Sequence, residues 1–301
     1  MSELIRQNAA TEIAIQTVLD SLDSPHSRRA YERRQFIAWH RASGHPVFNK
    51  AIVQRYAAEL RESGLSASTI NQRLSAIRKL AAEAADNGAL DAQLANGIRA
   101  IKGIRQEGTR TGNWLTKKQA QEMLCAPDTR TLKGLRDRAI LGLLIGCGLR
   151  RAETAGVTFS HIQQRDGRWV LVDLIGKRNK IRSVPMPNWT KQAIDEYAIA
   201  ANFGEGILFR PVNKGGRMAG GRMSEQAIYN LVGHYAEALG LASIAPHDLR
   251  RSFAKLAHKG GSGIDQIQLS LGHGSIQTTE RYLGVQQDLT NAPCDHLGLR
   301  L

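Results

Sequence analysis

Four short segments in the second half of the chain carry polar side chains that could act together on a phosphodiester. The segments are GCGLRRAE, IGKRNK, PHDLRR and LGHGSIQTTERY. Their candidate functional residues, in chain order, are Arg150, Glu153, Lys177, His247, Arg250, His273 and Tyr282. Each segment alone is a weak signal, because an arginine after an apolar helix can simply complement the helix dipole and a lysine in a turn is usually just solvated. The combination is what indicates a reaction.

Tyrosine is a weak nucleophile at neutral pH unless positive charge surrounds it. Because its pKa is about 10, ionising the phenol at pH 7 costs on the order of 4 kcal/mol. Attack on a phosphodiester also adds negative charge to the two non-bridging oxygens, which a guanidinium fork can bind through two hydrogen bonds. Arg150 and Arg250 are therefore the candidates to bind the phosphate. His247 stands three residues before Arg250 on a predicted helix, so both side chains can face one phosphate.

In this order, the residues resemble the signature of the tyrosine recombinase family, also called the phage integrase family, which is Arg, Lys, His-x-x-Arg, His and Tyr. The match runs from Arg150 to Tyr282 in the contexts GLRxxE, GK, HxLR and LGHxxxxTTxxY. The resemblance implies that Tyr282 is the nucleophile and forms a covalent 3′-phosphotyrosyl intermediate. It also implies that Lys177 is the general acid for the departing 5′ oxygen and that His273 donates to the phosphoryl oxygens.

The same resemblance gives Glu153 the task of orienting Arg150. Lys180 lies in the same turn as Lys177 and is a second candidate for the general acid. The family pattern often has a second His where Arg251 stands and a Ser or Lys where Gly274 stands. Neither position performs the chemistry described above.

The expected reaction needs no cofactor and no metal, because the phosphotyrosyl bond conserves the energy of the broken phosphodiester. The sequence has no GxxxxGK[ST] loop and no paired carboxylates in a metal-binding context. The predicted activity is site-specific recombination of duplex DNA for integration, excision or resolution, as in a mobile genetic element. Two alternatives stay open: relaxation of DNA by a type IB topoisomerase mechanism, and a noncatalytic accessory protein that binds duplex DNA.

Composition agrees with a partner that is a polyanion. The chain has 301 residues, with 41 Lys and Arg against 27 Asp and Glu, and a net charge of +14. Aromatic residues make up only 5%, which argues against a single-strand surface built on base stacking. The first residues lack a basic and an apolar signal region, and no apolar run reaches the length of a membrane span. Three cysteines suit a reducing compartment, so we expect a cytoplasmic protein with no membrane partner.

Ser27 and Thr116 are predicted helix N-caps, Ser66 marks a further helix start, and an apolar stripe follows it at Ile70, Leu74, Ile77 and Leu80. The β-prone runs RWVLVDLI and IRSVPMP on either side of GKRNK predict a hairpin. Together these patterns predict a mainly α fold with a small antiparallel sheet, in two domains. We expect an N-terminal segment at 1–24, a helical core-binding domain at 25–101, a linker at 102–114, a catalytic domain at 115–284 and a C-terminal tail at 285–301. The first 24 residues are too few and too acidic for an additional arm-binding domain. By resemblance, the two domains would close around duplex DNA, and a homo-tetramer would act on two synapsed sites.

Basic residues on two predicted helices of the first domain are the candidate DNA contacts. They are Arg28, Arg29, Arg33, Arg73, Arg78 and Lys79. A solvated helix face would have the same pattern, so that alternative stays open. The tail ends in apolar Leu297, Leu299 and Leu301, so we expect it to pack into a neighbouring subunit.

Overall fold

The protein is represented by a computed structural model that describes residues 35–43, 48–105, 113–176, 179–241 and 243–284. Contacts divide the chain into two compact units, Met1–Thr109 and Arg110–Leu301. None of the helices in the described ranges is long and apolar enough to cross a membrane.

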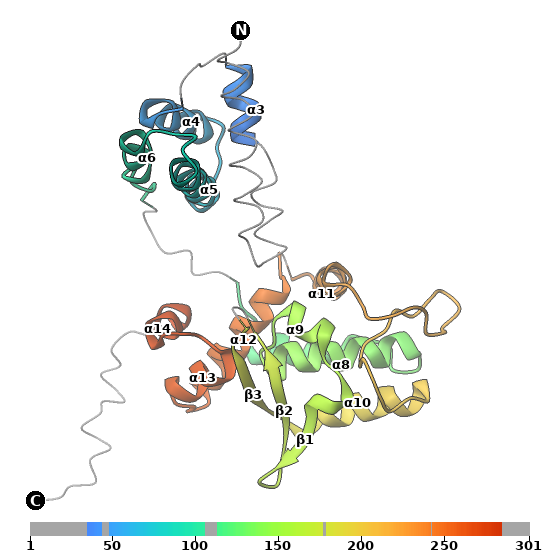
Figure 1. The fold of residues 1–301 in the computed structure, drawn as a ribbon. Coiled ribbons are helices and arrows are strands. Elements are labelled where there is room, and N and C mark those ends of the chain that lie inside the picture. The colour runs from blue at the N-terminus through green and yellow to red at the C-terminus, as the bar shows by residue number, and fades with distance from the viewer. Residues whose placement is uncertain (1–34, 44–47, 106–112, 177–178, 242, 285–301) are drawn as a thin grey trace, which may run out of the picture. The chain divides into compact units, whose positions relative to one another are not determined.

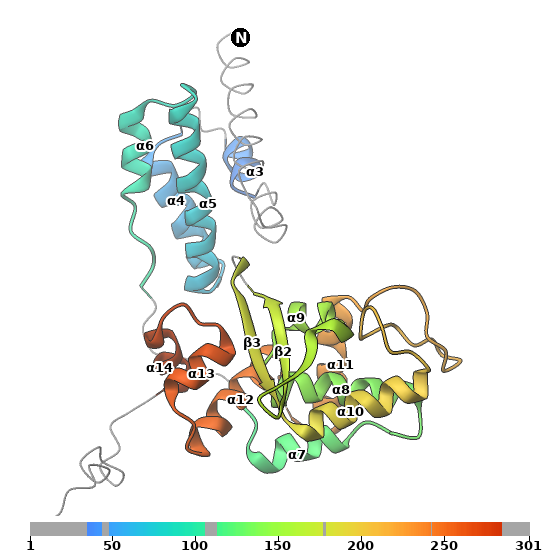
Figure 2. The same cartoon turned by 60° about the horizontal axis from the view of Figure 1, so that its bottom comes forward.

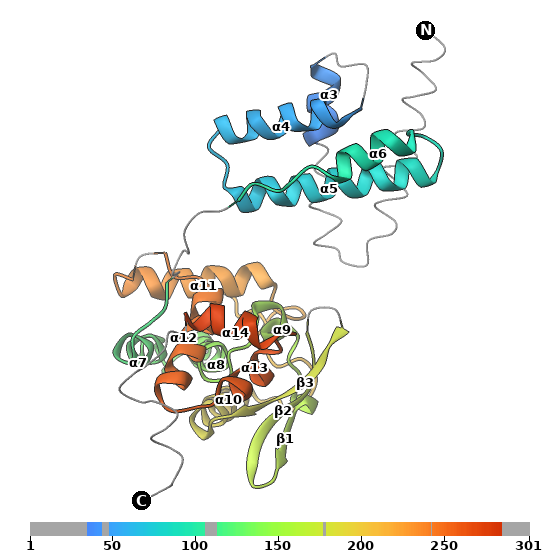
Figure 3. The same cartoon turned by 90° about the vertical axis from the view of Figure 1, so that its left-hand side faces the viewer.

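The described part of the first unit is a group of helices (Figures 1 and 3). They are α3 (Gln35–Ala42), α4 (Lys50–Glu62), α5 (Ala67–Asp86) and α6 (Ala92–Arg99). Asn49, Ser66 and Asp91 cap the last three, because each side chain accepts a hydrogen bond from a backbone N–H in the first turn. The predicted N-cap Ser27 lies outside the described residues.

Helix α5 forms the centre of this unit and packs against both α4 and α6. Three residues of its predicted stripe, Ile70, Leu74 and Ile77, are buried in one cluster with Val53 and Tyr56 of α4, whereas the fourth, Leu80, is half-buried. The spacing of three and four residues puts the stripe on one helical face, so the core follows directly from the sequence.

The second unit combines helices with one small sheet (Figures 1 and 2). Its helices are α7 (Lys117–Cys125), α8 (Leu132–Gly146), α9 (Arg151–Gly156), α10 (Asn188–Ala201), α11 (Glu225–Ala238), α12 (Pro246–Lys259), α13 (Ile264–Leu271) and α14 (Ile276–Leu283). The strands are β1 (Ile162–Arg165), β2 (Arg168–Ile175) and β3 (Ile181–Met186), antiparallel in the order β1-β2-β3. The predicted fold class is confirmed, and the strand β1 is an addition to the predicted hairpin.

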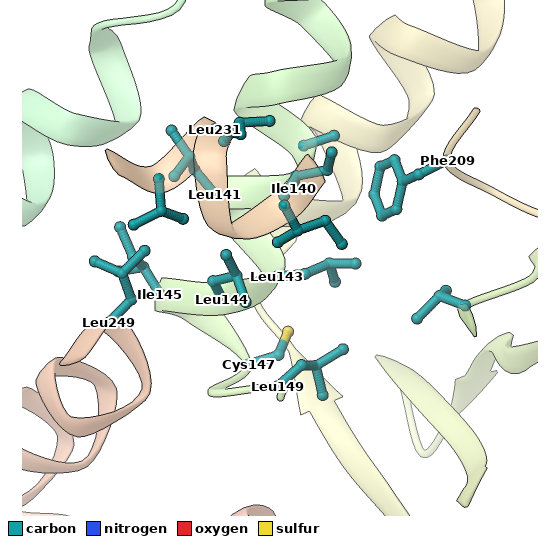
Figure 4. Packing of buried hydrophobic residues seen from close by; sticks show 14 of the residues in the cluster. Ile140, Leu141, Leu143, Leu144, Ile145, Cys147, Leu149, Phe209, Leu231 and Leu249 are labelled. Carbon is teal, nitrogen blue, oxygen red and sulfur yellow. The ribbon is translucent and has the colours of Figure 1, made fainter. Parts of the chain in front are cut away.

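Helix α8 is the buried centre of the second unit, as its apolar sequence predicts. Its side chains meet Leu231 of α11, Leu249 of α12 and Phe209 in one cluster (Figure 4). After α8 the chain turns at Gly148, which has φ +60. A Cβ there would lie 2.5 Å from the Phe253 ring, so only glycine lets α12 approach this turn.

Helix α12 also contacts the residues at the start of the described part of the second unit. The backbone N–H of Leu115 donates to Ser252 Oγ at 2.7 Å, and the Lys255 ammonium lies 3.9 Å from the centre of the Trp114 ring. Both partners belong to α12, and Leu115 is buried. Trp114, the last residue of the predicted linker, and Leu115, the first residue after it, are therefore both held by this helix.

Candidate active site

The predicted site residues converge on one part of the second unit. Arg150 precedes α9, Glu153 lies within it, and His247 and Arg250 lie on the first turns of α12. His273 follows α13, and Tyr282 lies in the last turn of α14. Arg150 and Arg250 are close enough to both histidines and to the tyrosine for their charges to lower the pKa of each. Lys177 falls between β2 and β3, outside the described residues.

Tyr282 lies beside both histidines. Its ring centre is 5.5 Å from that of His247 and 5.3 Å from that of His273, and both imidazoles meet the phenol nearly at right angles. The hydroxyl donates to the backbone carbonyl of His247 at 3.3 Å. Leu283, the next residue, is buried in the small core that α12, α13 and α14 share, so the helix bearing the phenol is anchored there.

Arg250 is a buried cation held by backbone oxygens. Only 2% of the residue is exposed. Its Nη1 donates to the carbonyl of Gly148 at 2.6 Å, and its Nη2 donates to the carbonyl of Leu271. Burial and then the charge of Arg150 lower the pKa of Arg250 to about 9, so the group stays charged at neutral pH. This guanidinium joins the turn after α8 to the end of α13.

Arg150 is held by the carboxylate of Glu153. Its Nη1 donates to Glu153 Oε1 at 2.7 Å, and its backbone N–H donates to Oε2 at 2.8 Å. Burial alone would raise the pKa of Glu153, but hydrogen bonds from Arg182 and Arg150 and their charges lower it to about 2. The carboxylate is therefore ionised, and it orients Arg150 while neutralising only one of the neighbouring cations.

Both histidines are neutral at pH 7. Burial, followed by the charges of Arg250 and Arg150, lowers the pKa of His273 to about 4. Partial burial, followed by the charges of Arg251 and Arg250, also lowers the pKa of His247. His273 Nδ1 lies 3.0 Å from the hydroxyl of Thr279, which is fully buried. A neutral imidazole can donate one proton and accept another, which suits work at a phosphate.

Burial raises the pKa of Tyr282, and the charges of Arg250 and Arg251 offset this only in part. Arg251 lies 5.1 Å from the centre of the phenol ring. The phenol is thus protonated at neutral pH, and further positive charge or a base is needed for it to react.

Two contributing residues were missed by the sequence analysis, Arg182 and Thr279. The alternation of β3 offered a signal for the first, since Arg182 shares a face with Val184 and Met186, which are buried. A cation on the apolar face of a strand requires a partner, and here the partner is Glu153. Thr279 lies in the TTERY segment, where helical spacing relative to Leu283 places it on the buried side.

The candidate DNA contacts of the first unit differ in their surroundings. Arg73 is half-buried beside the Tyr56 hydroxyl. Arg78 donates to the carbonyl of Ile101 and is half-buried, so it also supports the fold of this unit. Lys79 is half-buried on α5. Arg28, Arg29 and Arg33 lie outside the described residues.

Comparison with known proteins adds a second line of observation. The model of the phage integrase family matches residues 113–288, and the phage integrase N-terminal SAM-like domain matches residues 19–88. A tyrosine recombinase of Synechococcus elongatus is 31% identical over 94% of this chain and 92% of its own length. Tyrosine recombinase XerC of Xylella fastidiosa is 32% identical over 86% of each chain. The Tn1549 transposon integrase, solved with circular intermediate DNA, shares the fold with a TM-score of 0.69 at 16% identity, covering 93% of this chain and 96% of its own.

These matches and the order of the polar residues agree, and the chain belongs to the phage integrase family. It is a tyrosine recombinase, an enzyme of site-specific recombination, as the sequence predicted.

Proposed function

We propose that the enzyme cuts and rejoins duplex DNA through a 3′-phosphotyrosyl bond to Tyr282. The observation that carries this proposal is that the phenol lies beside both His247 and His273, where the charge of the buried Arg250 acts on it. A site with a protonated tyrosine and more cations than carboxylates favours an anionic substrate that the tyrosine can attack.

Arg150 and Arg250 would bind the two non-bridging oxygens of the scissile phosphate. Each is already oriented by other groups, Arg150 by Glu153 and Arg250 by two backbone carbonyls. Donors fixed in advance need little reorganisation when negative charge develops in the transition state. The pair would therefore stabilise the pentacoordinate phosphorus rather than merely bind DNA.

The histidines would handle the hydrogen bonds and the proton. We assign His273 the tautomer in which Nδ1 accepts from the Thr279 hydroxyl, which leaves Nε2–H to donate to a phosphoryl oxygen. His247 is neutral and adjacent to Tyr282, so its imidazole can accept the phenol proton as the P–O bond forms.

Departure of the 5′ oxygen needs a proton donor, for which Lys177 is proposed from its place in the motif. Lys180 remains the alternative, and its ammonium lies near the second histidine: a Cβ on Gly274 would be 3.3 Å from Lys180 Nζ. The 5′ oxygen takes up this proton and leaves as a hydroxyl. The 5′ hydroxyl of a second DNA strand can then attack the phosphotyrosyl bond and release Tyr282, so that no cofactor is consumed.

We further propose that residues 25–101 form a core-binding domain that grips DNA together with the catalytic domain at 115–284. A homo-tetramer on two synapsed sites would carry out the exchange in the cytoplasm, with the tail at 285–301 packed into a neighbouring subunit. The DNA complex of the Tn1549 integrase and the net charge of +14 support the choice of DNA as partner.

The direct test traps the covalent bond. Nicked duplexes drawn from DNA that flanks the gene lose a short strand after cleavage, so rejoining fails and the adduct accumulates. We expect a protein–DNA adduct on denaturing gels that is abolished in Tyr282→Phe, because the phenol oxygen supplies the new P–O bond. Tyr229→Phe is the matched control, since Tyr229 is exposed on α11. An adduct that survives in Tyr282→Phe would move the nucleophile elsewhere and overturn the proposal.

A further inference from the structure

We propose that Arg182 on β3 is a positioning residue that holds Arg150 in its catalytic orientation and also fixes the segment before His273. This inference rests on the function proposed above. The side chain of Arg182 is only 9% exposed, and its three donor nitrogens are each occupied by another protein group. Its described hydrogen bonds go to Glu153 and to the backbone of Ser270, so we place its effect on the reaction in these neighbours.

The first link runs through Glu153. Arg182 binds both carboxylate oxygens at once, with Nη1 to Oε1 at 2.8 Å and Nη2 to Oε2 at 2.9 Å. The same two oxygens accept from the side chain and the backbone of Arg150. The fork of Arg182 thus sets the plane of the carboxylate, and the carboxylate sets the direction of the Arg150 guanidinium.

The second link runs to the segment that ends in His273. Arg182 Nε donates to the carbonyl of Ser270 at 2.9 Å. Gly272 has φ +63, and a Cβ there would lie only 2.8 Å from Cδ of Arg182. The aliphatic part of Arg182 therefore lies directly against the residue that precedes His273.

The third link reaches the end of the β2–β3 hairpin. A Cβ on Gly176 would lie 3.1 Å from Arg182 Nη1 and 3.4 Å from Glu153 Oε1. The backbone N–H of Gly176 also donates to the carbonyl of Lys180 at 2.8 Å. Arg182 thus contacts three segments: α9, the end of α13 and the hairpin. In the sequence, these segments lie next to Arg150, His273 and Lys177, respectively.

A lysine could not replace these contacts. Its single ammonium cannot bind both carboxylate oxygens of Glu153 in one plane and at the same time donate to the carbonyl of Ser270, as Nε of Arg182 does. Loss of this arrangement should affect chiefly the step that depends on Arg150, the neutralisation of the non-bridging oxygens. A scissile methylphosphonate has a methyl group in place of one non-bridging oxygen and carries no charge, so it needs this neutralisation much less.

The test measures single-turnover adduct formation by the full chain on a phosphodiester and on a methylphosphonate of the same sequence. We expect Arg182→Gln to slow adduct formation on the phosphodiester by on the order of 100-fold, as is typical when a residue supporting an active-site group is lost, and on the methylphosphonate by less than about 5-fold. Arg182→Lys should lie between the wild-type and Arg182→Gln on the phosphodiester. An equal slowing on both linkages by Arg182→Gln would overturn the proposal.

Arg136→Gln is the matched control, because Arg136 is equally buried and also binds one carboxylate, Asp137, and one backbone carbonyl, that of Arg210. It should slow both linkages by similar factors. If Arg182→Gln does not fold, Arg182→Lys provides the same comparison between linkages. A second measurement combines Arg182→Gln with Arg150→Gln on the phosphodiester, where the two losses should be far less than additive. Fully additive losses would contradict positioning, whereas a wild-type chain that forms no adduct would contradict the proposed function instead.

Discussion

The phenol of Tyr282 is protonated at neutral pH, since burial raises its pKa more than Arg250 and Arg251 lower it. Its proton is donated to a backbone carbonyl, which is too weak a base to remove it. The cost of ionisation is thus at least that of a free tyrosine, on the order of 4 kcal/mol at pH 7. Neutral His247 beside the ring is the group through which that cost can be avoided, by proton transfer during attack.

Glu153 gives a prediction for stability that depends on pH. Its pKa in the folded chain is about 2 against 4.5 in a free side chain, so its ionisation stabilises the fold above pH 4.5. That contribution, on the order of 3 kcal/mol, is lost as the pH falls from 4.5 through 2. We expect Glu153→Gln to lower the free energy of unfolding strongly near neutral pH and much less near pH 2, measured by urea denaturation.

Glu237→Gln is a suitable control for that experiment, because it makes the same substitution at an exposed carboxylate on α11. Its effect on stability should be small at each pH. If the destabilisation by Glu153→Gln were the same at acid and neutral pH, the carboxylate would not owe its low pKa to the two arginines.

The resemblance to the family signature predicted six catalytic residues in one site, and the five that the structure describes, all but Lys177, lie together there. Arg182 was not predicted, since its partner Glu153 is on another element and the pairing is created only by the packing of β3 against α9 and α13. The burial pattern of a strand shows that such a cation needs a partner but does not say which one. The catalytic roles of the residues predicted from the sequence stay predictions until the covalent adduct is trapped.

At the level of elements, capping residues and apolar periodicity predicted most helices of the described chain. Ser66 and Thr116 cap α5 and α7 as expected, and Thr116 forms a capping box with Gln119. Strand β1 was not predicted because its sequence, IQQR, is polar; it exists through its pairing with β2. A strand at the edge of a sheet owes its conformation to its neighbour more than to its own residues.

The end of α13 gives a second prediction. Gly272→Ala should destabilise the fold for two reasons: φ +63 disfavours any residue with a Cβ, and that Cβ would collide with the Arg182 side chain. Gly240→Ala is the matched control, with φ +66 and no atom within 4 Å of the added Cβ. We expect both variants to lose about 1 kcal/mol from backbone strain. Only Gly272→Ala should lose more and slow adduct formation, measured by urea denaturation and by trapping; equal behaviour of the two would refute the contact.

For the whole molecule, the net charge of +14 predicts steep salt dependence of DNA binding. Cations that replace counterions at phosphates make the logarithm of affinity fall linearly with the logarithm of salt concentration. We expect a loss of on the order of a thousandfold or more between about 50 and 200 mM salt. Fluorescence anisotropy with a labelled duplex measures it, and affinity independent of salt would argue against a grip on the phosphates.

The salt dependence of single variants measures how much each residue contributes to binding the phosphates. Lys79→Gln should reduce the salt slope by about one unit if its ammonium contacts a phosphate. Arg78→Gln should in addition lower the stability of the first unit, because Arg78 also bonds the carbonyl of Ile101.

The attachment of Trp114 and Leu115 to α12 has a mechanical consequence. Ser252, which binds Leu115, lies only two residues after Arg250 on the same helix. The chain at Leu115 and two residues of the candidate site, His247 and Arg250, are therefore attached to one helix, so a displacement of one is passed to the other.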